Sequence, residues 1–190
     1  MARHGVSVLM SRTKDENDVL SDEIKECNAF APDIAVGLHN NAGGGDGSEV
    51  FHSVKGGIGK TLALNILAEI DAIGQNSRGA KIRKNSNGAD YYGFIRQTNA
   101  PAVIVECAFV DNKKDIQIID TAAEQKAFGV AIAKGILKTL GIAWKAQTAA
   151  TNTATTGKIY RVQVGAYSQK ANAEAMQKKL KAAGYDAIIV

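Results

Sequence analysis

The sequence predicts an α/β fold in which a mostly parallel, twisted sheet is flanked by helices and followed by a small C-terminal βαβ unit. The runs "DIAVGLH" and "AVIVE" predict the sheet, because both are continuously apolar, as strands covered on two faces are. Apolar residues recur at helical spacing between and after these runs, which predicts the helices. Strands that alternate with helices in this way are typical of a largely parallel sheet.

The first fifty residues contribute three predicted strands and one helix. The alternating, β-branched stretch "GVSVLMSR" predicts a strand, and "SDEIKECNAFA" predicts a helix with Ser21 as its N-cap. "DIAVGLH" is the next strand. "GSEVFHS" predicts a further short strand after a glycine loop.

Two longer helices complete the predicted domain. A surface helix from Lys60 is predicted by the apolar spacing of Leu62, Ile66, Ile70 and Ile73. The following stretch, "RGAKIRKNSNGAD", is polar and broken by glycine, and "AVIVE" then gives a fourth strand. Residues 122–140 are amphipathic over a long span, and a left-handed glycine cap at 141 is expected to end that helix.

The composition changes after residue 142. We expect a domain over residues 1–142, an Ala/Thr-rich linker over 143–158 and a short module over 159–190. In the module, "IYRVQVGAYS" predicts a strand, "ANAEAMQKKLKAAG" a helix and "YDAIIV" the start of another strand.

The charge and the cysteines exclude several classes of protein. A net charge of +4 and a pI near 9.0 suit an anionic partner, but without a dense basic run we expect no nucleic-acid binding. Cys27 and Cys107 have no CxxC spacing, so we expect core thiols. No apolar run approaches the ~20 residues of a membrane helix, so we expect no stable membrane insertion. "MARHGVSVLMSR" lacks the features of a signal peptide.

Two polar residues end apolar strands in a way that is typical of sites. In open parallel sheets, ligands gather at the carboxyl ends of the strands, and His39 and Glu106 both lie at such ends. An imidazole there can bind a metal, and a glutamate can serve as a ligand or as a general base. A strand-end histidine equally serves as a structural hydrogen-bonding residue, so both interpretations stay open at this point.

A third motif indicates a different class of enzyme. "KGGIGKT" opens a helix after a short strand and resembles the deviant phosphate-binding loop of the chromosome-partitioning ATPases. In that hypothesis, Lys60 contacts phosphate and Thr61 contacts magnesium. The alternative is a glycine-rich turn into a helix, which the short domain and the glutamate that ends "AVIVE" favour.

Several segments, taken in order, carry a resemblance to a known family. "VLMSRT", "DIAVGLHNNA", "GSEVFHS", "NSRGAKIRK" and "YYGFIRQTNAPAVIVECAFVDNKKD" resemble the zinc-dependent N-acetylmuramoyl-L-alanine amidases of the autolysin and phage endolysin type. The resemblance spans residues 6–141. The tail "YRVQVGAYSQKANAEAMQKKLKAAGYDAIIV" resembles one half of a SPOR-type peptidoglycan-binding repeat, which is found after such amidases in sporulating bacteria.

The resemblance implies a zinc hydrolase mechanism. His39 matches a zinc ligand of the family and Glu106 matches its catalytic glutamate. Zinc would polarise the lactyl amide carbonyl and acidify a bound water, whose proton Glu106 would accept and later deliver to the leaving L-alanine nitrogen. Asn40 and Asn41 would shape the site or form its turn, and Arg12 is expected to be structural.

The sequence departs from the family at its N-terminus. The family supplies two further zinc ligands, a histidine and a glutamate, before the segment that matches "GVSVLMSR", and Met1 lies almost at that point. His4 and His52 match no family ligand. We therefore expect a truncated N-terminus that lacks the first strand and helix, and a rival function is that of a peptidoglycan-binding remnant that does not cleave.

The resemblance also implies the setting in which the protein works. Its partner would be peptidoglycan, both the glycan strands and the stem peptides, and its location the cell wall or the extracellular space. We expect a monomer.

Overall fold

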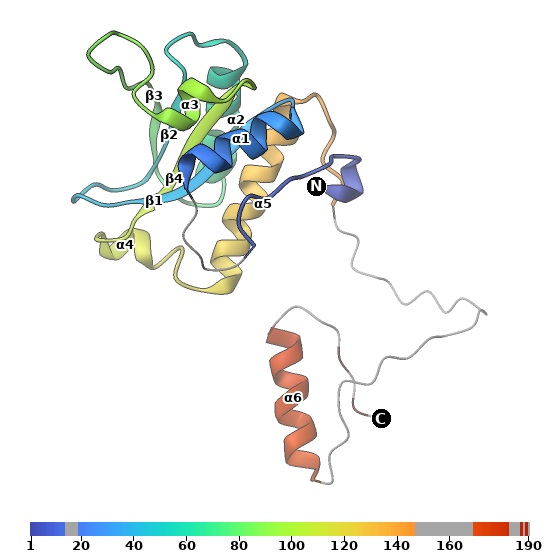
Figure 1. Cartoon of the computed structure of the whole chain (residues 1–190). Helices are drawn as coiled ribbons and strands as arrows, with labels where there is room; N and C mark the ends of the chain where they lie inside the picture. The colour runs from blue at the N-terminus through green and yellow to red at the C-terminus, as the bar shows by residue number, and fades with distance from the viewer. Residues whose placement is uncertain (14–18, 147–168, 183–186, 188, 190) are drawn as a thin grey trace. The chain divides into compact units, whose positions relative to one another are not determined.

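A four-stranded mixed sheet organises the larger part of the protein in the computed structural model (Figure 1). The structure describes residues 1–13, 19–146, 169–182, 187 and 189. The chain divides into two compact units, Met1–Gln147 and Thr148–Val190. The sheet belongs to the first unit, and its strands are β1 (Ala35–Asn41), β2 (Ser48–His52), β3 (Ser77–Lys81) and β4 (Ala102–Phe109).

The strand order is β1-β4-β2-β3, and the sheet has two parallel pairs and one antiparallel pair. β1 and β4 run parallel, as do β2 and β3, whereas β2 runs antiparallel to β4. The short loop between β1 and β2 reverses the chain, while each parallel pair is joined through helices, as parallel connections require. The expected α/β class with a mostly parallel sheet is confirmed.

The core lies between one face of the sheet and two helices, α2 (Gly57–Asp71) and α5 (Ala122–Thr139). Strand residues Val50, Val103 and Val105 face this layer and are fully buried. Apolar burial of this kind contributes roughly 25 cal/mol per Å² of area removed from water. This face of the sheet is therefore mostly apolar, with the buried Ser48 and His52 as its polar members on β2.

The opposite face carries α1 (Leu20–Phe30) and α3 (Gly93–Gln97), which contact each other, and α3 also contacts β4 (Figure 1). The ring of Tyr92, just before α3, meets the ring of Phe51 with centroids 5.0 Å apart. The Asn28 side chain ties α1 to the end of α3, because it donates to the Gln97 carbonyl at 3.0 Å and accepts from the Asn99 N–H at 2.8 Å.

Most of the predicted elements are present, with shifted ends. The strands in "DIAVGLH", "GSEVFHS" and "AVIVE" are confirmed, and so are the two long helices. The second of these ends as expected, since Gly141 adopts a φ of +69°. The helix predicted from Lys60 begins earlier, at Gly57, and α1 begins at Leu20 with Val19 rather than Ser21 at its N-cap.

One predicted strand is wrong and several elements were missed. "GVSVLMSR" follows a short 3-10 helix, Ala2–His4, and forms no strand. Its apolar side chains are not buried, since Val8 and Met10 are 55% and 64% exposed. Alternation alone does not form a strand without a partner to complete its hydrogen bonds. β3, α3 and the short helix α4 (Lys113–Ile116) arise in stretches whose polarity gave no periodic signal.

The second unit contributes α6 (Lys170–Ala182), where a helix was predicted. The strand predicted in "IYRVQVGAYS" and most of "YDAIIV" lie outside the described residues, as does most of the predicted linker. The domain boundaries at 142 and 158 stay predictions. In the parts of the chain that the structure describes, no helix has the length and apolar character needed to cross a membrane.

A glycine sets how closely α5 approaches α2. A Cβ at Gly135 would lie 2.6 Å from the Ile66 Cα, which is backbone and cannot move aside cheaply. We therefore expect Gly135→Ala to lower the free energy of unfolding by about 1–3 kcal/mol, through the strain that overpacking creates. Chemical denaturation measures this change.

Gly129 provides the matched control in the same helix. A Cβ there would meet no atom within 4 Å, so Gly129→Ala should raise the free energy of unfolding by up to about 1 kcal/mol through helix propensity. Equal effects of the two substitutions would contradict the close-approach role of Gly135.

Candidate active site

The structure brings the two predicted site residues together. His39 on β1 and Glu106 on β4 are register partners in adjacent parallel strands. Neighbouring strands lie about 4.8 Å apart, and paired residues project from the same face, so the two side chains stand side by side. The pairing becomes irregular immediately beyond His39, before Asn41, a feature often found next to active sites.

Glu106 has the environment of a reactive carboxyl group. Its side chain is half-buried, and the buried Oε2 atom has no hydrogen-bond partner among the described residues. Burial raises the pKa of Glu106 above its ordinary value; His39 partly opposes this and the negative charge of Glu49 adds to it. A carboxyl group with an unused oxygen beside an exposed imidazole is suited to proton transfer.

Glu49, which sequence reasoning missed, lies on the other side of Glu106. It is the antiparallel register partner of Glu106 and is only 5% exposed. Two cations on β3 hold it: the Arg78 Nε donates at 2.8 Å and the Lys81 Nζ at 2.5 Å. Burial alone would raise the pKa of Glu49, but these two partners outweigh it and lower the pKa.

The four strands therefore present a row of charged and polar side chains across one face of the sheet. His39, Glu106, Glu49 and the Arg78–Lys81 pair follow one another from β1 to β3. A signal for Glu49 was present in "GSEVFHS", where a charged residue interrupts an otherwise strand-like run. Its partners gave no such signal, since cations in a polar, glycine-broken stretch usually lie on a solvated surface.

Asn41 joins this row, whereas Asn40 does not. The Asn41 Nδ2 donates to the Glu49 Oε1 at 2.9 Å, and its Oδ1 accepts from the Ala42 N–H at 2.8 Å. Asn41 therefore links the end of β1 to the buried carboxylate and begins the turn as well. The side chain of Asn40 is exposed.

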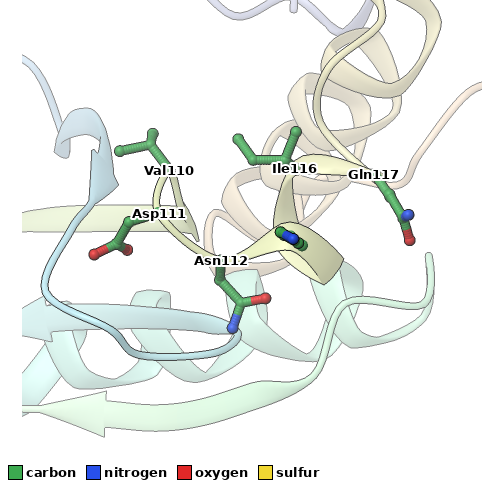
Figure 2. A pocket seen from close by; sticks show the side chains of 6 residues that line it. Val110, Asp111, Asn112, Ile116 and Gln117 are labelled. Carbon is green, nitrogen blue, oxygen red and sulfur yellow. The ribbon is translucent and has the colours of Figure 1, made fainter.

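The turn after β4 holds the glycine loop that follows β1. The Asp111 carboxylate accepts from the N–H groups of Gly43 and Gly44 at 2.7 and 2.8 Å, and the Asn112 side chain donates to the Gly45 carbonyl at 2.8 Å. Figure 2 shows Asp111 and Asn112 projecting from this turn toward the loop. The carboxyl ends of β1 and β4, the strands that carry His39 and Glu106, are thus joined beyond the sheet.

Packing tightens the same loop. A Cβ at Gly45 would clash with the ring of Phe109, so the ring occupies the space that any larger residue would need. The guanidinium of Arg78 lies over this ring, 5.1 Å from its centroid. Phe109 therefore touches both the glycine loop and the cation that holds Glu49.

The other histidines lie away from this row. His52 is on β2 three residues beyond Glu49, so it projects from the opposite face, and its Nδ1 lies 2.8 Å from the Ser53 carbonyl oxygen. His4 is buried against Trp144, with ring centroids 4.9 Å apart, and its Nε2 accepts from the Lys145 N–H. Arg12 is exposed in the segment without regular structure.

The "KGGIGKT" motif and the cysteines have structural environments. Gly56 and Gly57 adopt φ values of +70° and +63° where the chain enters α2, and Lys60 and Thr61 are exposed on its first turn. Cys107 is buried in the core, where burial and the nearby Glu106 raise its pKa to about 12, and Cys27 is half-buried; both are free.

A zinc site needs several donor side chains close together. Nowhere in the described ranges do three or more His, Cys, Asp or Glu side chains form a group that could hold a metal. A catalytic zinc is normally held by three protein ligands. The described residues therefore do not form a complete zinc site.

Comparisons with known proteins agree with this fold. The family model Amidase_3, N-acetylmuramoyl-L-alanine amidase, matches residues 1–138, and the SPOR domain model matches residues 133–190. The chain thus belongs to the N-acetylmuramoyl-L-alanine amidase family, whose members are peptidoglycan amidases and are generally zinc-dependent. The amidase match includes "KGGIGKT", and nothing in the comparisons favours an ATPase.

Two curated relatives match almost the whole chain. It is 30% identical over 187 residues to N-acetylmuramoyl-L-alanine amidase CwlM of Bacillus licheniformis, covering 97% of this chain and 67% of the relative. It is 30% identical to the sporulation-specific N-acetylmuramoyl-L-alanine amidase of Bacillus subtilis strain 168, covering 98% and 68%.

Solved structures share the fold of the first unit. Cwp6 from Clostridium difficile superposes with a TM-score of 0.71 at 38% identity, over 73% of this chain and 23% of that one. The catalytic domain of CwlV, an amidase from Bacillus (Paenibacillus) polymyxa var. colistinus, gives a TM-score of 0.63 at 23% identity, over 72% and 74%. At that identity, the second likeness shows the fold alone.

The buried Asp115 carboxylate binds the end of β4 and the loop before β2, and it makes the stability of the fold depend on pH. Asp115 is 1% exposed, and its carboxylate accepts from the N–H groups of Phe109 and Gly47 at 2.7 and 2.9 Å. Burial would raise the pKa of Asp115, but these hydrogen bonds outweigh it and lower the pKa. The stabilisation is therefore present above the unfolded-state pKa, about 3.9, and is lost as the pH falls through the folded-state pKa.

We expect Asp115→Ala to lower the free energy of unfolding at pH 7 by about 2–4 kcal/mol, because two buried N–H groups lose their acceptor. Asp115→Asn should lower the free energy of unfolding by less, and the difference between this variant and wild type should become smaller below pH 4. Urea denaturation from pH 7 to pH 3 measures both effects, with the exposed Asp71→Asn as control. A deficit that is constant over this range would contradict the role given to the carboxylate charge.

Proposed function

We propose that this chain acts on peptidoglycan at the amide bond between the N-acetylmuramoyl lactyl group and the L-alanine of the stem peptide. The observation that carries the proposal is the register of His39 with Glu106 in two adjacent parallel strands, with an unpartnered Glu106 oxygen. Membership of the amidase family supports the reaction class.

Glu106 is the proposed catalytic residue. Its unused Oε2 can accept a proton from the attacking water and return it to the leaving L-alanine nitrogen, which is general acid-base catalysis by a single carboxyl group. The Asn41–Glu49 contact and the Asp111 contacts hold the two strand ends on either side of this carboxyl group.

His39 is the proposed zinc ligand of this chain. Its imidazole is exposed, and its Nε2 lies 3.5 Å from the point where a Cβ at Gly37 would stand, so the ring lies next to the Gly37 backbone. A zinc ion at His39 needs further donors that the described residues do not bring there. This shortage favours a second candidate function, in which the chain binds peptidoglycan without cleaving it.

The SPOR match supports wall binding by the second unit. We propose residues 1–142 as the amidase domain, 143–158 as a linker and 159–190 as a partial SPOR-like module, with the glycan strands and stem peptides as partners. The place of action is the cell wall or the extracellular space, and the protein is a monomer that inserts in no membrane.

Glu106→Gln tests the catalytic assignment. Release of L-alanine-terminated stem peptides from purified peptidoglycan should fall by about 10²–10⁴-fold, because the amide of glutamine cannot accept the proton. The fold should persist, which circular dichroism and thermal unfolding will check. Exposed Glu26→Gln is the matched control and should cleave like wild type; equal activity of the two variants would overturn the assignment.

His39→Ala tests the zinc assignment by a measurement that needs no activity. In competition with a weak chelator, the wild-type chain should bind zinc at least tenfold more tightly than His39→Ala, because the imidazole is the one histidine ligand in the row. His52→Ala, which removes an imidazole from the opposite face, should bind zinc like wild type. Equal zinc affinity of wild type and His39→Ala would exclude His39 as a ligand.

Peptidoglycan sedimentation separates the two candidate functions. A protein that co-sediments with purified peptidoglycan in the presence of zinc but releases no L-alanine amine is a binding protein. Co-sedimentation accompanied by amine release is the amidase outcome.

A further inference from the structure

The cations on β3 exceed what Glu49 requires. Arg78 and Lys81 both contact the same oxygen, Oε2, of one buried carboxylate, so the cluster carries one surplus positive charge. Their side chains are 36% and 34% exposed, whereas the Glu49 side chain is 7% exposed. The surplus charge therefore faces solvent on the same side of the sheet as Glu106.

Arg78 is held in place with most of its donors unused. Its Nε donates to Glu49, and its guanidinium lies over the Phe109 ring. The two Nη groups have no acceptor among the described residues. An arginine fixed by stacking and by one hydrogen bond presents a preorganised pair of donors, which suits a carboxylate bound by two parallel hydrogen bonds.

The position of these donors relative to Glu106 sets the length of an extended peptide that could reach both. Glu49 pairs with Glu106, and Arg78 lies on the next strand, so two strand spacings of about 4.8 Å separate β3 from β4. An extended peptide advances about 3.3 Å per residue. A peptide whose first amide lies at Glu106 and which runs across the row would reach Arg78 within about three residues.

We propose that Arg78 and Lys81 form a subsite for a carboxylate of the stem peptide, two or three residues beyond the scissile amide. This subsite rests on the proposed function. It would give the amidase a preference for stem peptides with a free carboxylate over stem peptides in which that group is amidated. Glu49 serves the subsite by holding both cations, and Phe109 by supporting the guanidinium.

A purely structural ion pair is the competing role for this cluster. Glu49 needs compensation because a buried, unpaired carboxylate is costly. One cation would provide that compensation. The second cation and the unused Nη donors are the features that a structural role does not require.

Binding of two soluble ligands to the Glu106→Gln full chain tests the proposal without requiring catalysis. The ligands are N-acetylmuramoyl tripeptides that differ only in a free carboxylate or a carboxamide on the residue after L-alanine, with a second pair that differs at the third residue. Calorimetry should show about tenfold tighter binding of the free acid in one of the pairs, and higher salt should reduce the difference.

Variants then assign the preference to the cluster. Added to Glu106→Gln, Arg78→Gln should bring the tenfold ratio close to one, while Arg78→Lys should retain part of it. Lys84→Gln removes an exposed lysine just beyond β3 and should leave the ratio unchanged. The comparison between ligands within one protein stays valid even if a variant is less stable.

The outcomes separate this proposal from the proposed function. Equal affinity for acid and amide in both pairs, or a ratio that Arg78→Gln does not change, overturns the subsite, and cleavage of peptidoglycan by wild type would still support the amidase. Failure to bind any of the ligands, together with failure to cleave peptidoglycan, overturns both.

Discussion

The parallel pairing of β1 with β4 is the constraint on which the site depends. The two strands are more than sixty residues apart in the chain, and only their register places the imidazole of His39 beside the carboxyl group of Glu106. A shift of one residue would move either side chain to the opposite face of the sheet. The apolar face opposes such a shift, since it would expose Val103 and Val105 and bury Glu106 against α2.

Charge compensation accounts for the rest of the row. The reversal of β2 places Glu49 next to Glu106, and two carboxylates so close would repel each other without compensation. β3 provides it from the edge of the sheet, where long cationic side chains can contact a buried group and keep contact with water. The same arrangement lowers the pKa of Glu49 and leaves Glu106 with an unused oxygen.

The sequence was informative where burial dictates residue type. Continuous apolar runs located β1 and β4, and the polar residues that end these runs located His39 and Glu106, because ligands gather at the carboxyl ends of such strands. β3 carries two cations and a glycine, and its strand conformation comes from pairing with β2, which no local pattern reveals. The expected strand near Val8 failed for the converse reason, since a suitable pattern had no neighbour to pair with.

The ring of Phe109 couples two parts of the protein that differ in purpose. One side of it fills the space above Gly45, and the guanidinium of Arg78 rests on it. A side chain at position 45 requires a smaller residue at position 109, and that smaller residue removes the platform of Arg78. Among homologues, positions 45, 78 and 109 should therefore change together, so that sequence change in a surface loop is restrained by a cation on β3.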